Sequence, residues 1–255
     1  MTTLNYINLT IVIVLPPFDL GQLIREDNAG NITSKKTYSL TAEGTTPSSP
    51  TSTYEYGYAS GWGDRLTSYN GQTIEYDVIG NPTRYYNGLS YNFTWTGRQL
   101  TGATKGGVSY SFTYNDEGMR TSKTKNGVTT TYYLEGSRIV AEETNDNLTV
   151  YIYDASGMPV GMQYCQNSST STAWEVYWFE RNLQGDIVAV YSSEGVKLVE
   201  YKYDAWGNAA VTYYNSGSST TATKNPFRYR GYYYDQDLGS TTCRLDTMTR
   251  TPVDL

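Results

Sequence analysis

The sequence lacks histidine, and it contains only two cysteines among its 255 residues. The absence of histidine excludes Ser-His-Asp and Cys-His catalysis and every metal site built on imidazole ligands. The cysteines, Cys165 and Cys243, lie in unrelated sequence contexts, so the sequence assigns them no disulfide, and a cysteine metal site would need further ligands. We therefore predict no catalytic, cofactor-binding or metal-binding residue, and we do not expect an enzyme.

Long apolar runs and clusters of basic residues are also missing. The run from Ile11 to Leu15 is too short to span a bilayer. The first basic residue is Arg25, so the start of the chain lacks the charged segment of a signal peptide. The net charge is −6 without a basic stripe, which argues against nucleic acid as a partner. We expect residues 1–17 to be a non-repeat leader, with no membrane span and with the localisation unknown.

Tyrosine, in contrast, is abundant: the chain contains 27 of these residues. Tyr110, Phe112 and Tyr114 alternate with small hydroxyl residues, and this period of two places the three rings on one face of a strand. Asn126-Gly127 predicts a type I′ hairpin turn, because both central positions of that turn need positive φ. No apolar stripe of helical period extends beyond two turns, so we expect an almost helix-free protein with a largely tyrosine core.

The same unit recurs along the chain at a nearly fixed spacing. An aromatic residue is followed by a polar residue and a nearby glycine, and the aromatic positions 76, 95, 114 and 133 are each 19 residues apart. Such a period is typical of repeat proteins, in which each unit packs mainly on its neighbours. The residues that we assign to this structural motif are Tyr76, Asp77, Gly80, Tyr114, Gly118, Tyr153, Asp154, Gly157, Tyr203, Asp204, Gly207, Tyr234, Asp235 and Gly239.

These units resemble the YD repeats of the Rhs family of bacterial secreted and cell-surface proteins. The likeness covers about residues 18–239, and the sequence NPFRYRGYYYD at 225–235 resembles the start of the Rhs repeat-associated core. The resemblance implies a spiralling sheet of hairpins that forms a hollow shell around a C-terminal toxin domain, a domain that we expect to be absent here. We assign 18–224 to the YD-repeat sheet and 225–239 to the start of the core.

Residues 240–255 depart from the family pattern. After Gly239 an Rhs core would continue Leu-Tyr-Tyr-Leu and, two residues later, Arg-Tyr-Tyr-Asp-Pro, whereas this chain continues Ser-Thr-Thr-Cys-Arg-Leu. Codons exist for this tail that spell the family signature when they are translated from one nucleotide earlier. We therefore interpret 240–255 as an atypical, frameshifted tail of a truncated product, in which Cys243 and Met248 have no dedicated role.

Two features of the repeat invite a functional interpretation, and for each we favour a structural one. The carboxylates of Asp77, Asp154, Asp204 and Asp235 could form an acid–base or metal ladder. Groups that recur once per repeat are better explained as caps that bind backbone N–H groups of their own turns, since a catalytic site needs a unique constellation. The tyrosine rings could bind sugars, but we favour a packed repeat core.

The sequence thus predicts an all-β chain of tandem hairpins in one curved antiparallel sheet, with a structural function as a segment of an Rhs-type shell. Two alternatives stay open: a cell-surface module that binds carbohydrate, and a non-functional fragment of a decayed gene. No cofactor is expected. The partner implied by the resemblance is an encapsulated toxin domain, and open sheet edges predict self-association.

Overall fold

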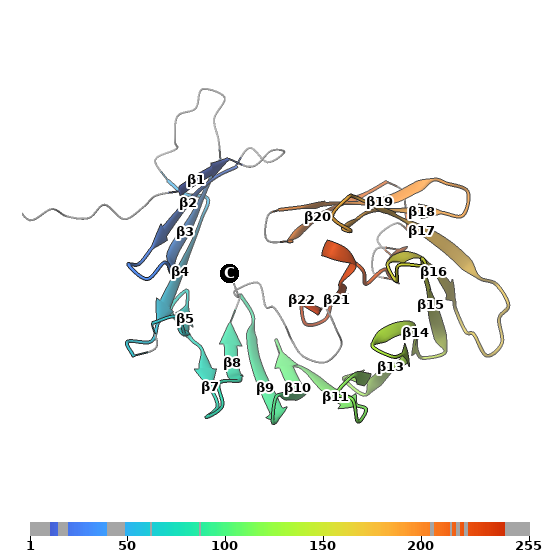
Figure 1. Ribbon diagram of the computed structural model, residues 1–255, viewed down its shortest axis with the longest axis horizontal. Helices are drawn as coiled ribbons and strands as arrows, with labels where there is room; N and C mark the ends of the chain where they lie inside the picture. Colours follow the sequence, from blue (N-terminus) through green and yellow to red (C-terminus); the bar gives the residue numbers. More distant parts are fainter. Residues whose placement is uncertain are drawn as a thin grey trace, which may run out of the picture. The chain divides into compact units, whose positions relative to one another are not determined.

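The computed structural model describes residues 11–14, 20–39, 49–61, 63–86, 88–204, 207–214, 216–217, 220–221 and 224–242. The contacts divide the chain into two compact units, Met1–Tyr91 and Asn92–Leu255. Within each unit, antiparallel strands follow one another in chain order (Figure 1). Most of the predicted leader lies outside the described residues, as do Phe18, Asp19 and the tail from Cys243 onward.

The first unit contains a six-stranded antiparallel sheet in the order β1 to β6, followed by the pair β7 and β8. Its rings pack in pairs, such as Tyr56 and Tyr69, whose ring centroids lie 5.2 Å apart. The strands are β1 (Ile11–Val14), β2 (Leu20–Glu26), β3 (Ile32–Ser39), β4 (Ser52–Tyr58), β5 (Leu66–Tyr69), β6 (Gln72–Thr73), β7 (Glu75–Tyr76) and β8 (Pro82–Tyr86). The boundary between the units falls within β9 (Ser90–Thr96).

The second unit is a longer run of hairpins, and its strands are hydrogen-bonded in chain order from β9 to β20. They are β10 (Gln99–Lys105), β11 (Val108–Tyr114), β12 (Arg120–Lys125), β13 (Val128–Glu135), β14 (Arg138–Thr144), β15 (Asn147–Tyr153), β16 (Pro159–Cys165), β17 (Glu175–Arg181), β18 (Ile187–Ser192), β19 (Lys197–Tyr203) and β20 (Ala209–Tyr213). The fold prediction, a long antiparallel sheet of sequential hairpins, is confirmed.

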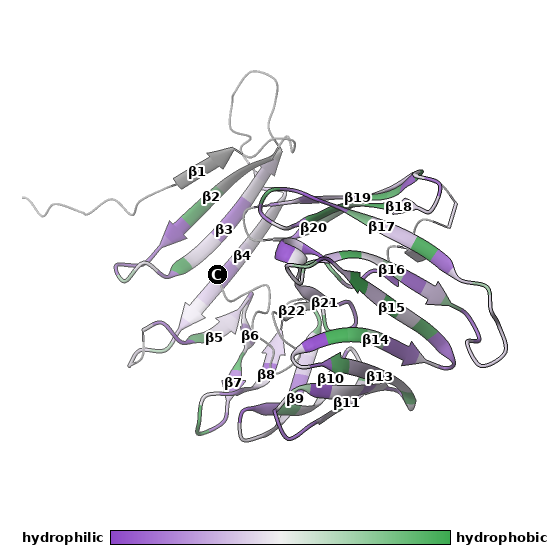
Figure 2. Ribbon diagram, turned by 45° about the vertical axis from the view of Figure 1, so that its right-hand side comes forward, coloured by the Kyte–Doolittle hydropathy of each residue, from purple (hydrophilic) through white to green (hydrophobic). Residues whose placement is uncertain are grey.

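Local turn chemistry sets the register of these hairpins. Asn126 and Gly127 have φ angles of 48° and 86°, so the predicted type I′ turn is confirmed. It places Lys125 opposite Val128 and continues the pairing of β12 with β13 as far as Ser122 and Thr131. The burial pattern of β11 alternates between buried and exposed residues, which is the period of two that the sequence predicts. Figure 2 shows green, hydrophobic segments on most strands of this unit.

One face of the second unit carries its core, and we call it the inner face. Tyr110 and Phe112 are buried on it, while Ser109, Ser111 and Thr113 on the opposite face are exposed. The sheet curves around a short C-terminal segment that contains the 3₁₀ turn η1 (Tyr229–Gly231) and the hairpin β21 (Tyr233–Asp235) and β22 (Ser240–Thr242) (Figure 1). Within the described residues, no helix has the length and apolar character needed to cross a membrane.

Candidate functional site

Several repeat turns are built around an aspartate that binds its own backbone, and asparagine takes this place at Asn115 and Asn182. The Oδ1 atom of Asp77 accepts the N–H groups of Ile79 (3.0 Å) and Asn81 (2.8 Å), and Asp154 accepts those of Ser156 (2.9 Å) and Met158 (3.0 Å) in the same way. Hydrogen bonds from the Ser156 hydroxyl and the Met158 N–H, together with Arg181, hold the pKa of Asp154 well below its usual range. These carboxylates stabilise turns and do not converge on one site.

In four of the motifs the tyrosine connects two strands. Its hydroxyl donates a hydrogen bond to a backbone carbonyl at or near the start of an earlier strand, which is the preceding strand for Tyr114, Tyr153 and Tyr203 and is β5 for Tyr76. The four pairs are Tyr76 with Leu66 (2.8 Å), Tyr114 with Leu100 (2.6 Å), Tyr153 with Ile139 (2.6 Å) and Tyr203 with Ile187 (2.7 Å). Arg138, which directly precedes Ile139, lies over the Tyr153 ring at 4.9 Å. The arginine and the tyrosine therefore form one unit, although they belong to different strands.

The inner face of the second unit is covered by residues 224–239, which we call the strap. The strap begins over β17 to β19, where Arg228 lies 4.4 Å from the Tyr201 ring, and runs back across the sheet to β10. Its successive contacts are Lys224 with Glu175 (2.6 Å), the N–H of Arg230 with Asp186 (2.7 Å), the hydroxyl of Tyr233 with Glu142 (2.8 Å), Asp235 with Lys123 (3.0 Å), and the carbonyl of Asp237 with Lys105 (2.7 Å). A side chain takes part in each of these contacts. A backbone hydrogen bond, from the N–H of Ile187 to the carbonyl of Arg228 (3.1 Å), also joins the strap to the sheet.

An aromatic cluster holds the middle of the strap. The ring of Phe227 packs edge-on against Tyr151 (4.9 Å between centroids), Tyr153 (6.0 Å) and Phe179 (6.3 Å). Each such pair contributes about 0.5–1.5 kcal/mol beyond the area that it buries. The sequence predicts that each repeat packs mainly on its neighbours. The strap adds a further contact to this core, because Phe227 packs on rings of β15 and β17.

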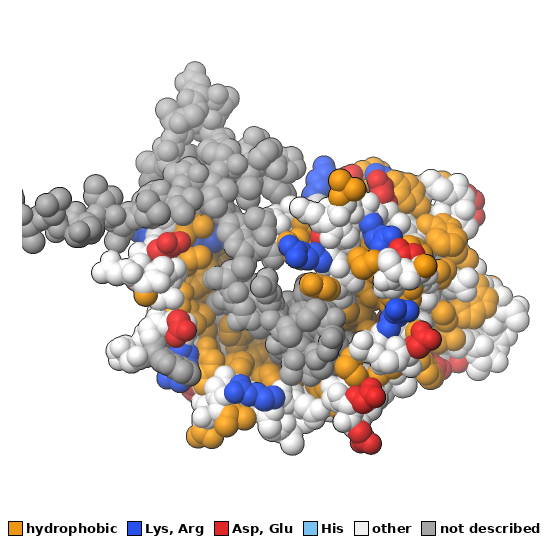
Figure 3. Space-filling view, viewed as in Figure 1, with side chains coloured by type: hydrophobic (Ala, Val, Ile, Leu, Met, Phe, Trp, Pro, Cys, Tyr) orange, Lys and Arg blue, Asp and Glu red, His pale blue; other side chains and the backbone are white. Residues whose placement is uncertain are grey.

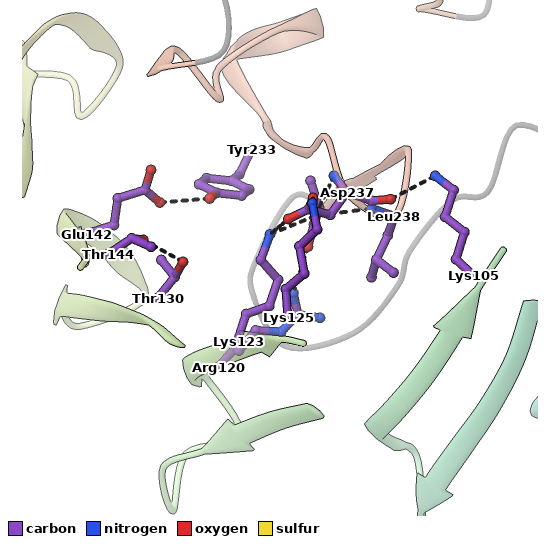
Figure 4. A network of polar contacts seen from close by, with 11 residues as sticks. Lys105, Arg120, Lys123, Lys125, Thr130, Glu142, Thr144, Tyr233, Asp237 and Leu238 are labelled. Atoms are coloured by element: carbon purple, nitrogen blue, oxygen red, sulfur yellow. Dashed lines mark hydrogen bonds and ion pairs between the residues drawn. The ribbon is translucent and has the colours of Figure 1, made fainter. Parts of the chain in front are cut away.

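A buried ionic cluster anchors the end of the strap (Figure 4). The carboxylate of Asp235, only 1% exposed, lies 3.3 Å from the guanidinium of Arg120 and 3.0 Å from the ammonium of Lys123. The carboxylate of Asp237 lies 2.8 Å from Lys123 and 2.6 Å from Lys125. The two strap carboxylates therefore neutralise a row of cations on β12. Arg120 and Asp235 are each 1% exposed, so removing either of them would leave the charge of the other buried without its counter-ion.

The titration behaviour of the cluster reflects burial and charge. Burial disfavours the ammonium of Lys123, but Asp235, with smaller contributions from Tyr132 and Asp237, raises the pKa of Lys123 above its usual value. Burial also raises the pKa of Glu142, which accepts the Tyr233 hydroxyl. The cations of the cluster are therefore charged at neutral pH. On the face of the molecule shown in Figure 3, acidic and basic side chains are intermixed.

Comparison with known proteins finds relatives of this chain by sequence. The chain is 33% identical over 184 residues to the tRNA3(Ser)-specific nuclease WapA of Bacillus spizizenii and 34% identical over 184 residues to the tRNA nuclease WapA of Bacillus subtilis. Both alignments cover 69% of this chain and 7% of the relative, so the chain spans a small part of the length of the curated relatives that it matches. No family model matches the sequence.

Solved structures share the fold. The crystal structure of TcdB2-TccC3-Cdc42 matches 85% of this chain and 11% of its own with a TM-score of 0.60 at 16% identity. The Photorhabdus luminescens Tc holotoxin pore matches 87% of this chain and 11% of its own with a TM-score of 0.59 at 15% identity. At these identities the likeness shows the fold alone. The chain belongs to the Rhs family of YD-repeat proteins.

The YD motif residues occupy two different environments in this family member. Asp77, Asp154 and Asp204 lie at turn surfaces, whereas Asp235 lies in the buried cluster. Arg120, Lys123 and Asp237 belong to the same cluster, and sequence reasoning did not select them. A signal for them exists, since β12 places cations opposite the aromatic residues of β11. Among the described residues, no group of three or more His, Cys, Asp or Glu side chains is placed to hold a metal ion.

Proposed function

We propose that this chain is a wall segment of a YD-repeat shell whose inner face is turned toward a C-terminal toxin domain. The observation that carries the proposal is the strap, which is held on the inner face by the buried cluster around Asp235. The segment 225–239, which we propose as the start of the Rhs core, thereby brings β21 and β22 to the concave side of the sheet. A domain attached beyond this point would begin on that side.

The role that we propose is structural. Curated relatives are named as tRNA nucleases, and we assign catalytic activity of that kind to parts of the relatives outside the matched region. The buried charged residues of this chain support that assignment, because Arg120 and Lys123 both form ion pairs with Asp235. The YD residues act as turn caps and strand ties, and a shell wall needs those properties in every repeat.

Photocrosslinking tests which side of the sheet meets the payload. Trp95 shares the face of the buried Phe93, while the adjacent Thr94 is exposed on the opposite face. A benzophenone amino acid replaces Trp95 with a ring of similar character, and the same substitution at Thr94 serves as the matched control. With a toxin domain of a YD-repeat relative appended to the chain, we expect crosslinks to that domain from position 95 and few from position 94. Equal crosslinking from both positions, or crosslinking from position 94 alone, would overturn the proposal.

A second candidate function, carbohydrate binding at a cell surface, has one observation in its favour. Trp178 is 45% exposed on the outer face, where it lies opposite both Gly161 and Tyr191. A Cβ atom on Gly161 would approach the indole within 3.0 Å, so the glycine gives the ring room to lie against the sheet. Flat exposed rings suit sugar stacking. A glycan panel with Trp178→Ala against Trp174→Ala distinguishes this function, which requires loss of binding in the first variant only.

A further inference from the structure

We propose that the free edge of β20 is a self-association site, at which two copies of this chain pair their β20 strands in antiparallel fashion about a two-fold axis through Val211. This inference is independent of the shell function. It is carried by the position of β20 in the sheet, by the direction of its free backbone groups, and by its composition.

β20 differs from the other strands of the second unit in its exposure. It stands at the end of the strand order, and among the described strands it is hydrogen-bonded to β19 alone. All five of its residues are exposed, whereas each strand from β10 to β19 contains at least one buried residue. Val211 and Tyr213 are 37% and 52% exposed. They extend the apolar inner face, since they lie opposite Tyr201 and Val199 of that face.

The register fixes which backbone groups of β20 are free. The N–H of Tyr214 donates to the carbonyl of Leu198 at 3.0 Å, and Thr212 lies opposite Glu200. In an antiparallel pair, hydrogen-bonded and non-hydrogen-bonded positions alternate. The N–H and C=O groups of Ala209, Val211 and Tyr213 therefore point away from β19. They form a regular row of donors and acceptors that can bind another strand.

The edge also lacks the features by which proteins block such pairing. Edge strands are usually protected by lysine, proline, an inward charge or a β-bulge. The sequence of residues 209–214 is AAVTYY, which contains no charged residue, no proline and no glycine. The pairing of β19 with β20 runs from Val199–Tyr213 to Tyr203–Ala209 without a shift in register. An uncharged, β-prone segment of six residues on an open edge is a site of strand addition.

The strand is complementary to a second copy of itself. A two-fold axis through Val211 places Ala209 opposite Tyr213 of the second copy, so that a small side chain faces a large one at both ends. Ala210 faces Thr212 of the second copy, and no like charges meet within the paired strands. This register pairs all five residues of β20. Two strands of this length form a smaller contact than a stable dimer interface, so we expect weak, concentration-dependent association.

Sedimentation of the full chain over a range of concentrations tests the site. Val211→Pro removes only an N–H that points away from β19, and Val211→Lys places two ammonium groups opposite each other. We expect each to weaken dimer formation at least about tenfold while the β-sheet circular dichroism is retained. Val211→Thr, which keeps the N–H and the branched side chain, is the matched control and should associate like the parent. A monomeric parent, or association unaffected by Val211→Pro and Val211→Lys, would overturn the proposal.

Disulfide capture tests the register by a second route. Ala210 and Thr212 of the other copy form non-hydrogen-bonded pairs in the proposed arrangement, where Cβ atoms approach closely enough for a disulfide. The double substitution Ala210→Cys and Thr212→Cys, made with Cys243→Ser, should give a covalent dimer under oxidation. Ala210→Cys alone, with the same Cys243→Ser change, should remain a monomer. Failure of the double variant to crosslink, or equal crosslinking of the single variant, would refute the register.

Discussion

Asparagine in place of Asp235 isolates the energy of the strap anchor, because the substitution keeps the shape of the side chain and removes its charge. Arg120 is 1% exposed and the side chain of Lys123 is 10% exposed, and both would lose their principal buried counter-ion. Breaking a buried ion pair from one side costs about 3–5 kcal/mol. Lys123 keeps Asp237 at 2.8 Å, so we expect the lower part of this range.

The matched control is Asp204→Asn, which changes the same position of another YD motif in the same unit. Its carboxylate lies at a turn and accepts the N–H of Asn208 at 2.9 Å, a bond that an amide oxygen can also accept. We expect this variant to lose less than about 1 kcal/mol. Chemical denaturation gives the free energy of unfolding, and hydrogen exchange shows whether the strap loses protection first. Equal losses in the two variants would refute the argument that burial makes Asp235 the anchor.

Three further predictions concern the rings and glycines of the second unit. Tyr153→Phe should lower the free energy of unfolding by about 1 kcal/mol, because the Tyr153 hydroxyl donates a hydrogen bond to the carbonyl of Ile139. Tyr132→Phe should leave the stability in thermal denaturation unchanged, because the buried Tyr132 hydroxyl has no hydrogen-bond partner among the described residues. Burial raises the pKa of Tyr132 from 10.0 to about 12, so its neutral form stabilises the fold below pH 10 and this contribution is lost as the pH rises toward 12. The whole loss amounts to about 2.7 kcal/mol once the pH exceeds both pKa values, and about half of it falls between pH 9 and pH 11. Denaturation at these two pH values should therefore show a smaller decline for Tyr132→Phe, and an unchanged decline would refute the assignment. Gly161→Ala should destabilise the fold by about 1–3 kcal/mol, because the new Cβ atom would lie 2.6 Å from the backbone oxygen of Tyr177. Gly102→Ala should be tolerated, because its new Cβ atom would have its nearest contact at 3.5 Å. Similar melting temperatures for the two variants would contradict this prediction.

The hairpins were predictable from sequence because their determinants are local. The turn at Asn126-Gly127 requires positive φ at two adjacent residues, and both residue types supply it. The alternation of Tyr110, Phe112 and Tyr114 with hydroxyl residues needs only the geometry of a strand. Both features depend on residues within one hairpin, so a single repeat contains the information that predicts its turn and the face of its rings.

The strap was not predictable in the same way, because its contacts join residues far apart in the chain. Asp235 binds Lys123 and Arg120, which precede it in the chain by 112 and 115 residues. Within its own motif, Asp235 resembles Asp77. One local difference separates the two: Asn81 follows Asp77 by four residues and binds its carboxylate, whereas Gly239 stands at the corresponding place after Asp235. A motif carboxylate without that asparagine keeps its Oδ2 atom available for a partner elsewhere, and this atom binds Arg181 in Asp154 and Arg120 in Asp235.

The register of β11 with β12 supplies the other half of this signal. The pairing places three cations directly opposite the three aromatic residues of β11: Tyr110 with Lys125, Phe112 with Lys123, and Tyr114 with Arg120. Opposite positions share a face, so cations must lie on a surface whose rings are being buried. Burying an ammonium or a guanidinium without a counter-ion costs several kcal/mol, and the hairpin itself contains no acid on that face. A hairpin of this composition therefore requires an acidic segment from another part of the chain, and Asp235-Gln236-Asp237 provides one within the proposed core. The same reasoning applies to any YD-repeat sequence in which a basic strand follows an aromatic one across an Asn-Asp-x-Gly turn.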